Sequence, residues 1–316
     1  MLRRPMAAAR RVPIMSVSEL NVVGLGLSVA GLIKGVTGIG FSTCALPFLV
    51  TAVGLEAAMA LVTIPAIVSN MAVIAGGNRI GDVVRRFWPF YLAIVPGIFA
   101  GLAALALVGL RPAVQLLAVT TIVYVGLALA RPDLALPKGL ERVLALPAGC
   151  LNGFFTGLTG SQIMPLMPYM MSLRLAPGEQ VQAINLAVTL ASAVLAAGLF
   201  WAGIMTPEFV VISTLGSIPA IAGVAVGGAM QRWLSPSAFR YVALATLGML
   251  AMSLYGRQSG ELAGRDACTA RAATVMTTPS RDADRTLPTD GQQMSWPPRS
   301  IPQPPGNAIP SKEYVE

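Results

Sequence analysis

The chain has 316 residues, of which 55% are hydrophobic and only 11% are charged, and it contains no histidine. Soluble domains carry about 25% charged residues, so this chain lacks the charge needed to cover a water-soluble surface. Its mean hydropathy of +0.69 instead predicts a protein dissolved in a lipid bilayer. Because histidine is the commonest metal ligand and proton shuttle, we expect no metal site, no catalytic residue and no cofactor.

The first 19 residues are expected to form a tail. Residues 1–14 contain four arginines but no apolar core long enough for a signal peptide. Met15 begins a more ordinary first segment. The hypothesis is therefore that residues 1–14 come from a misassigned start and that the native chain begins at Met15.

The apolar stretches that follow predict an all-α, polytopic helical membrane protein. They cover residues 20–33, 35–55, 57–78, 87–110, 112–130, 143–173, 180–207, 209–231 and 241–256. We divide them into a first transmembrane repeat at 20–131, a cytoplasmic linker at 132–142 and a second repeat at 143–256.

The last part of the chain, residues 257–316, has a different composition. It contains seven basic and seven acidic residues, frequent proline and few large apolar groups. Such a segment cannot bury enough surface to offset its chain entropy, so we interpret it as a disordered tail. The remaining basic residues lie in short loops, and no nucleic-acid partner is expected.

An internal repeat is the most informative feature of the sequence. Residues 31–38 and 153–160 both read G-x-x-x-G-x-T-G, and further landmarks follow each copy in the same order. These landmarks are Pro47 and Pro168, Glu56 and Glu179, Pro96 and Pro219, and Arg111-Pro112 and Ser235-Pro236. The pattern indicates a duplication with a period near 122 residues.

The number of segments in each copy predicts their relative orientation. Each copy holds a glycine-rich segment (20–38 and 143–160), a short segment (40–53 and 161–173) and three full-length ones. The short segments are either re-entrant or tilted and broken. An odd number of crossings turns the second copy upside down, which is the inverted-repeat plan of many secondary transporters.

The positive-inside rule agrees with this orientation. With the 78–86 loop in the cytoplasm, Arg111 is the one basic residue of the outside loops, and the inside loops hold Arg79, Arg85, Arg86, Arg131, Lys138, Arg142, Arg174, Arg232 and Arg240. The arginines of the N-terminal tail disagree with it, because they would lie outside. We expect a multi-pass protein of the cell (inner) membrane, with membrane lipid around it.

The glycine-rich segments are candidates for a substrate site. Glycine disfavours a continuous helix, so we expect breaks near residues 37–40 and 159–162. A break exposes free N–H groups and the positive end of a half-helix dipole, which together form an anion site. The candidate substrate-binding residues are Lys34, Gly35, Thr37, Gly38, Gly40, Asn152, Thr156, Gly157, Thr159, Gly160, Ser161, Gln162 and Asn185, and Asn70 and Thr63 are weaker candidates.

Two of these assignments have alternatives. The pairs Gly31-x-x-x-Gly35 and Gly153-x-x-x-Gly157 also fit close packing of helices, as do similar pairs at residues 97–101 and 223–227. Lys34 lies inside an apolar stretch, where a charge is expensive and usually functional. Its side chain could instead extend to the lipid headgroups. Thr156 occupies the equivalent position of the second copy, which makes the predicted site asymmetric.

The two motifs, GLIKGVTGIGFSTCALPFL and NGFFTGLTGSQIMPLMPYM, resemble those of the TauE/SafE family of sulfite exporter-like permeases. The resemblance covers roughly residues 20–256. It implies transport of small sulfur-containing or organic anions, driven by an ion gradient. Ser161-Gln162 stands where the first copy has Ile39-Gly40, so the two half-sites differ.

Three functions remain open from the sequence. The leading hypothesis is a secondary transporter that moves a small anion, with a proton or sodium as coupling ion. An anion channel would use the same hydrogen-bond donors. A membrane-embedded enzyme acting on lipid-linked substrates is weaker, because such enzymes need clustered acids or histidines.

Overall fold

The computed structural model describes residues 15–38, 40–77, 80–130, 135–137, 139–230, 244–245 and 247–256. These residues contain helices and no strand. The bounds are α1 (Val17–Thr37), α2 (Phe41–Val53), α3 (Leu55–Ala75), α4 (Ile80–Val108), α5 (Leu110–Ala130), α6 (Leu140–Thr159), α7 (Leu166–Ser172), α8 (Pro177–Trp201), α9 (Pro207–Met230) and a further apolar helix, Leu247–Gly256. Residues 1–14 of the predicted N-terminal tail (1–19) and the predicted tail at 257–316 lie outside the described residues, as do Arg79, Arg131, Lys138, Arg232 and Arg240; residues 17–19 of the predicted tail are helical.

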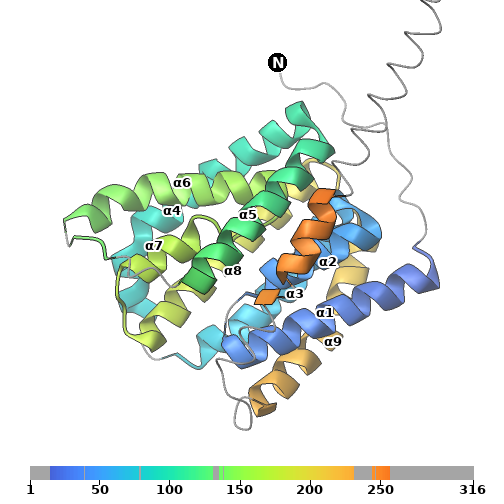
Figure 1. Ribbon diagram of the computed structural model, residues 1–316, viewed down its shortest axis with the longest axis horizontal. Helices are drawn as coiled ribbons and strands as arrows, with labels where there is room; N and C mark the ends of the chain where they lie inside the picture. Colours follow the sequence, from blue (N-terminus) through green and yellow to red (C-terminus); the bar gives the residue numbers. More distant parts are fainter. Residues whose placement is uncertain are drawn as a thin grey trace, which may run out of the picture. The chain divides into compact units, whose positions relative to one another are not determined.

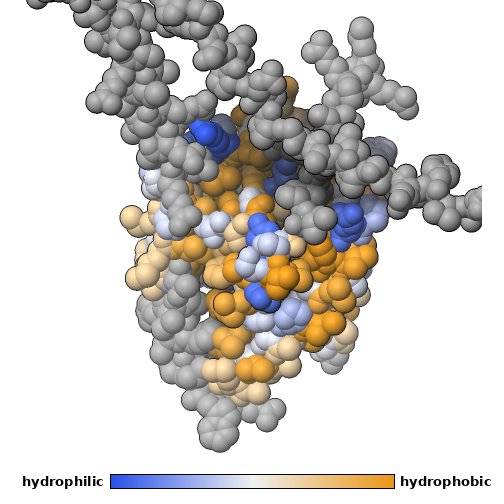
Figure 2. Space-filling model, turned by 90° about the vertical axis from the view of Figure 1, so that its right-hand side faces the viewer, coloured by the Kyte–Doolittle hydropathy of each residue, from blue (hydrophilic) through white to orange (hydrophobic). Residues whose placement is uncertain are grey.

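Six of the described helices are long and apolar enough to cross a membrane: α1, α3, α4, α5, α8 and α9. Large hydrophobic side chains are exposed on them, including Leu107 at 87% and Trp201 at 85%. On the face shown in Figure 2, hydrophobic residues outnumber hydrophilic ones. An apolar surface of this kind is unfavourable in water and favourable in lipid.

Helix α1 begins three residues before the expected segment at residue 20. Ser16 accepts a hydrogen bond from the backbone N–H of Glu19, and the Glu19 side chain accepts one from the Ser16 backbone. This capping box satisfies N–H groups that would otherwise lack partners, so it fixes the start of the helix at Val17.

Two helix pairs pack closely through glycines. Helix α1 lies against α9, and α4 lies against α6 (Figure 1). A Cβ atom at Gly31 or Gly35 would collide with backbone carbonyls of α9, and one at Gly97 or Gly101 would collide with those of α6. Backbones approach this closely only where a side chain is missing.

Helices α3 and α8 lie between these two pairs. Helix α3 contacts α8 and α9, and α8 contacts α3 and α4. Helix α3 therefore contacts the α1–α9 pair, α8 contacts the α4–α6 pair, and α3 and α8 contact each other. Polar residues on them are held away from lipid, which makes them suitable for building an internal site.

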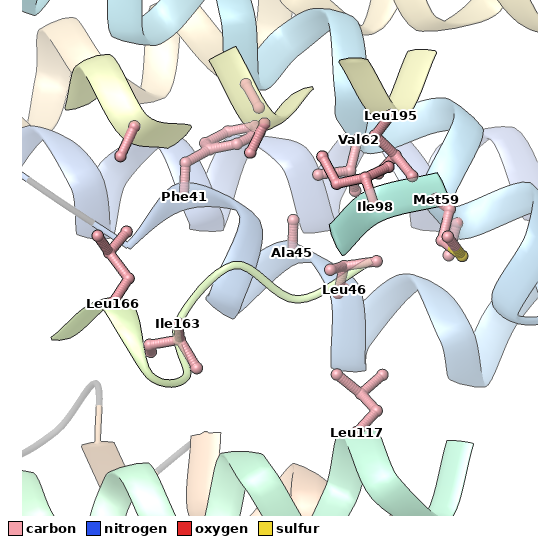
Figure 3. Close-up of a cluster of buried hydrophobic side chains, with 14 of the residues drawn as sticks. Phe41, Ala45, Leu46, Met59, Val62, Ile98, Leu117, Ile163, Leu166 and Leu195 are labelled. Atoms are coloured by element: carbon pink, nitrogen blue, oxygen red, sulfur yellow. The ribbon is translucent and has the colours of Figure 1, made fainter. Parts of the chain in front are cut away.

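The hydrophobic core joins the first half of the chain to the second. Figure 3 shows Phe41, Ala45 and Leu46 of α2 together with Ile163 and Leu166, from the segment that follows α6. All five side chains are buried. The two segments that follow the glycine-rich helices are thus packed in one core.

An ion-pair cluster connects the beginnings of three helices. Arg86 of α4 makes two hydrogen bonds to the Glu141 carboxylate of α6, at 2.8 and 3.1 Å, and one of 2.9 Å to Glu179 of α8. The two glutamates stand in the first turns of their helices, where a carboxylate also interacts favourably with the helix dipole.

Candidate functional site

Helices α1 and α6 end at glycines with matching backbone geometry. Gly38 has φ 76° and ψ −7°, and Gly160 has φ 75° and ψ −12°. Their N–H groups donate to the carbonyls of Lys34 (2.7 Å) and Thr156 (2.8 Å). This left-handed conformation is readily adopted only by glycine, so both helices stop where the sequence places a Thr–Gly pair.

The chain after each end differs between the two copies. Helix α2 starts at Phe41, after Gly40, which also has a positive φ of 93°. Helix α7 does not start until Leu166, and residues 161–163 are not helical. The second interruption is therefore longer than the expected one at 159–162.

Each helix end lies against the other half of the chain. The carbonyl of Gly38 accepts a hydrogen bond from the Asn185 amide of α8 at 3.1 Å, and the same amide donates to the Val181 carbonyl at 2.8 Å. A Cβ atom at Gly160 would meet Met59 of α3. Asn185 therefore ties the end of α1 to α8.

Lys34 is buried, with 1% of its surface exposed. Its Nζ atom donates to Ser69 Oγ at 3.1 Å and to Asn70 Oδ1, both on α3. The side chain therefore points into the protein and does not extend to the headgroups. In the part of the chain that the structure describes, no other charged side chain is buried.

The partner of Lys34 fixes the orientation of the Asn70 amide. The oxygen of Asn70 accepts from Lys34 Nζ, so it faces Lys34. The nitrogen is the other end of the amide. Asn70 Nδ2 is buried and has no hydrogen-bond partner among the described residues, and Asn70 lines a small cavity. Its two N–H groups are free to bind an acceptor there.

The small cavity lies at the beginning of α2 and has a volume of about 20 Å³, enough for about one water molecule or one oxygen of a ligand. Its polar lining consists of Gly40, Ser42, Thr43, Asn70, Gln162 and Asn185. No side chain caps α2 at Gly40, and the first N–H groups of a helix have no partner within it. The first turn of α2 therefore brings N–H donors and the positive end of a helix dipole to the cavity.

Gln162 connects the cavity to both halves of the chain. Its Nε2 donates to Ser192 Oγ of α8 at 2.9 Å, and its Oε1 accepts from Ser42 Oγ of α2 at 3.5 Å. Gln162 stands where the first copy has Gly40, so the asymmetry seen in the sequence places an amide beside the free end of α2.

Four other candidate residues hold the interruption after α6 together. Asn152 Nδ2 donates to the carbonyls of Gln162 (3.0 Å) and Met164 (3.3 Å). Thr156 Oγ1 donates to the Asn152 carbonyl at 2.8 Å, and Thr159 Oγ1 accepts from the Ser161 N–H at 3.2 Å. None of the four lines either of the cavities described here. Asn152 Oδ1 and Ser161 Oγ have no partner among the described residues.

The structure does not bring Gly35 and Gly157 to the cavity. Gly35 packs against the backbone of α9, and Gly157 packs against that of α4. Helix packing therefore accounts for both glycines. Thr37, whose hydroxyl donates to the Ile33 carbonyl at 2.8 Å, lies instead on a larger cavity.

The larger cavity, of about 430 Å³, adjoins the small one. The two share Gly40, Thr43, Ile163, Met167 and Ile184 in their linings. The other walls come from the ends of α1 and α5, the beginning of α8 and the helix near residue 247, and they are mainly apolar. This volume is large enough for a small organic anion to approach the polar end.

Sequence reasoning missed three residues of the site and gave a fourth little weight. Ser42, Ser69 and Ser192 were not predicted, and Asn70 was only a weak candidate. A signal was present, because Asn70 and Ser192 are separated by the repeat period, as are Lys34 and Thr156. Polar residues at equivalent positions of apolar helices indicate a shared interior location.

The family of the chain can be identified from its sequence profile. The family described as Sulfite exporter TauE/SafE matches residues 23–254, which include both glycine-rich motifs. No match is found among curated proteins or solved structures. Members of this family are membrane transporters and not enzymes, so the lipid-linked enzyme is removed from the alternatives. The chain is a multi-pass membrane protein and belongs to the sulfite exporter TauE/SafE family.

Proposed function

We propose that this protein is a secondary transporter of the cell (inner) membrane that carries a small anion, either a sulfur oxyanion or an organosulfonate. The observation that carries the proposal is the free amide nitrogen of Asn70. This nitrogen is buried and has no partner among the described residues, Asn70 lines the small cavity, and Lys34 holds the amide oxygen. A buried donor without a partner is unfavourable, and an anion supplies the missing acceptor.

The other groups around the cavity favour an anion over a cation. The uncapped beginning of α2 provides N–H donors, and Lys34 provides a positive charge one side chain away. No carboxylate lines either of the two cavities described above. Oxyanions bind well to such sites because each oxygen accepts several hydrogen bonds.

The helix contacts support two inverted repeats. The first helix of each copy packs against the fourth helix of the other: α1 on α9, and α6 on α4. Helices α3 and α8, the third of each copy, contact one another. A twofold axis in the membrane plane would generate this exchange of partners, and it would put the substrate site near the midplane.

The larger cavity supports alternating access. Its walls include Ala128 near the end of α5 and Pro177 at the beginning of α8. The loops beyond these ends are cytoplasmic in the topology predicted by the basic residues. In that topology the larger cavity would open toward the cytoplasm, and rocking of the two halves would open the other side.

The proposal is tested by flux into proteoliposomes that contain the purified full-length protein. Labelled thiosulfate, sulfite, sulfoacetate and methanesulfonate are supplied one at a time, and we expect saturable uptake of at least one. Preloading the vesicles with the same unlabelled anion should accelerate uptake by a carrier and not by a channel. Absence of flux for all four anions, from protein shown to be folded, would overturn the proposal.

A further inference from the structure

We propose that Lys34 couples anion transport to a proton: its amine takes up one proton when an anion in the larger cavity places one oxygen in the small cavity, and releases it when the anion leaves. This inference rests on the proposed function. It concerns the coupling ion, which the family match does not identify. The two ideas make separable predictions, because an anion site with a permanently charged Lys34 would bind anions without any change in protonation.

The immediate partners of Lys34 are neutral. Its Nζ donates to the hydroxyl of Ser69 and to the amide oxygen of Asn70, and its side chain is 1% exposed. The amine can donate both hydrogen bonds whether it carries two hydrogens or three, because each bond uses one hydrogen. The hydrogen bonds therefore do not themselves require the charged form.

The carboxylates on the helices packed around α1 are remote from Lys34. Helix α1 contacts α2, α3 and α9, and its end is bonded to α8 through Asn185. The described carboxylates of these helices are Glu56, Glu208 and Glu179, and α1 itself has Glu19; all four are in first turns. Glu179 is roughly 9 Å along α8 from Asn185, and it is paired with Arg86. At 1.5 Å per residue, Glu19 is roughly 22 Å from Lys34 along α1, and Glu56 is roughly 20 Å from Asn70 along α3.

The same comparison holds for α9. The part of α9 that lies beside Gly35 is residues 224–228, roughly 24 Å along the helix from Glu208 at 1.5 Å per residue. The remaining neighbour, α2, contributes no carboxylate, and its titratable group is the thiol of Cys44. The described residues therefore provide no fixed negative charge that would balance an ammonium group at position 34.

Burial without a counter-charge disfavours the protonated amine when the cavity is empty. An anion beside Asn70 Nδ2 changes this, because only one amide group then separates it from Lys34 Nζ. The bound negative charge favours the ammonium form, and the proton is drawn from water on the side where the cavity is open. Departure of the anion on the other side removes the counter-charge, and the proton is released there.

The asymmetry of the two copies sets the stoichiometry. Thr156 occupies the position equivalent to Lys34, and its hydroxyl donates to backbone carbonyls of Asn152 and Ser161. A threonine hydroxyl does not take up a proton in the physiological range. A lysine at only one of the two equivalent positions therefore predicts at most one proton for each anion carried.

The experiment measures protons taken up when thiosulfate binds to the purified full-length protein in detergent. Thiosulfate is suitable because its own charge is constant from mildly acidic to alkaline pH. Calorimetric titration in buffers of different ionisation enthalpy gives the number of protons bound per anion. We expect uptake to approach one proton at alkaline pH and to vanish at acidic pH, where Lys34 is already protonated in the free protein.

The affinity for thiosulfate should depend on pH for the same reason. Because the protonated form binds the anion, the affinity is highest at acidic pH, and it falls by up to about tenfold per pH unit once Lys34 is deprotonated in the free protein. Lys34→Arg keeps a charge that does not dissociate, so thiosulfate binding should become independent of pH and proton uptake should disappear. Arg85→Ala removes an exposed positive charge elsewhere and should leave both quantities unchanged.

The outcomes separate the two proposals. Failure of the wild-type protein to bind or transport any of the anions contradicts the proposed function. Thiosulfate binding without proton uptake at any pH, or with the same uptake in Lys34→Arg, contradicts the role of Lys34 and leaves the anion site standing. A requirement for sodium, seen as binding that depends on this ion and not on pH, also overturns it. Gel filtration and circular dichroism establish that each variant is folded.

Discussion

Lys34 Nζ donates a hydrogen bond to Asn70 Oδ1, from α1 to α3. The amide oxygen is therefore engaged by Lys34. The Asn70 nitrogen is buried and has no partner among the described residues, and Asn70 lines the small cavity. In this way, one hydrogen bond between two helices turns an amide, which can act as donor or acceptor, into a donor site.

We predict that Asn70→Leu weakens anion binding and that Asn70→Asp abolishes it. Leucine removes the two N–H groups, and the loss of hydrogen bonds to an anion should reduce affinity by about ten- to a hundredfold. Aspartate forms an ion pair with Lys34 and places a negative charge at the cavity, so it repels the anion. Binding of labelled thiosulfate to purified protein measures both effects.

Thr121→Val is a matched control for the Asn70 variants. Thr121 is buried in α5, and its hydroxyl donates to the Leu117 carbonyl of its own helix at 2.7 Å. It lines neither cavity, so its removal should leave thiosulfate affinity unchanged. Equal losses in Thr121→Val and Asn70→Leu would mean that the protein responds to any buried polar change, and Asn70 would have no special role.

We predict that Gly35→Ala destabilises the protein, whereas Gly24→Ala in the same helix does not. A Cβ atom at Gly35 would collide with the Val224 carbonyl of α9, but one at Gly24 meets nothing within 4 Å. Overpacking should cost about 1–3 kcal/mol at Gly35, while alanine at Gly24 gains up to about 1 kcal/mol of helix propensity. Thermal unfolding in detergent distinguishes them, and equal melting temperatures would contradict the close approach of α1 and α9.

At Gly38 the backbone, not the available space, should decide which substitutions are tolerated. The nearest atom to a Cβ there is 3.8 Å away, in Val181, but the positive φ excludes branched residues. We expect Gly38→Asn to retain measurable anion flux and Gly38→Val to lose it, because asparagine adopts the left-handed conformation far more readily. At Gly160 a Cβ atom would also meet Met59 at 2.7 Å, so Gly160→Asn should lose flux as well. Flux that survives in Gly160→Asn would show that the Met59 side chain can move aside at little cost.

The ends of α1 and α6 were predictable because their cause is local. A Thr–Gly pair followed by further glycine or polar residues cannot continue a helix at low cost, and Gly38 and Gly160 adopt the same left-handed geometry. The longer interruption after Gly160 was less predictable. Its conformation is held by Asn152, whose amide bonds the carbonyls of Gln162 and Met164, and this contact depends on how the chain folds back on α6.

The residues of the cavity were predictable only in part, because they meet through packing between distant helices. Lys34 was identifiable as a charge in an apolar stretch, but nothing in its spacing indicates that Asn70 is its partner. Gly35 presents the opposite difficulty. A glycine that allows helices to approach and a glycine that lines a site look alike in a sequence, and only the position of α9 separates them.

The Arg86 cluster should contribute modestly to stability, in a way that depends on salt. Its side chains are partly exposed, at 38% for Arg86, 21% for Glu141 and 27% for Glu179, so solvent screens the ion pairs. A double-mutant cycle with Arg86→Met and Glu141→Gln should give a coupling below about 1 kcal/mol, and high salt should reduce it. Arg85→Met, on the neighbouring exposed residue, is the control; a coupling that is large and insensitive to salt would indicate a more deeply buried pair.

The final prediction concerns the orientation of the two halves. Under the inverted arrangement that we propose, Arg111 at the start of α5 lies outside the cell and Arg142 near the start of α6 lies in the cytoplasm. Both are exposed, so a cysteine at either position is accessible to a reagent on its own side. In a background with Cys44, Cys150 and Cys268 replaced by alanine, a membrane-impermeant maleimide should label Arg111→Cys in intact cells, and it should label Arg142→Cys only after the membrane is opened.

This pair of sites is informative because it spans the junction between the copies. Helix α5 is long and apolar enough to cross the membrane, and it ends at Ala130, ten residues before α6 begins at Leu140. One crossing therefore separates residue 111 from residue 142, and it reverses the side on which the second copy starts. Labelling of both cysteines from outside would mean that α5 does not cross. The two halves would then be oriented alike, and the opposed helix ends on which the anion site depends would not face one another.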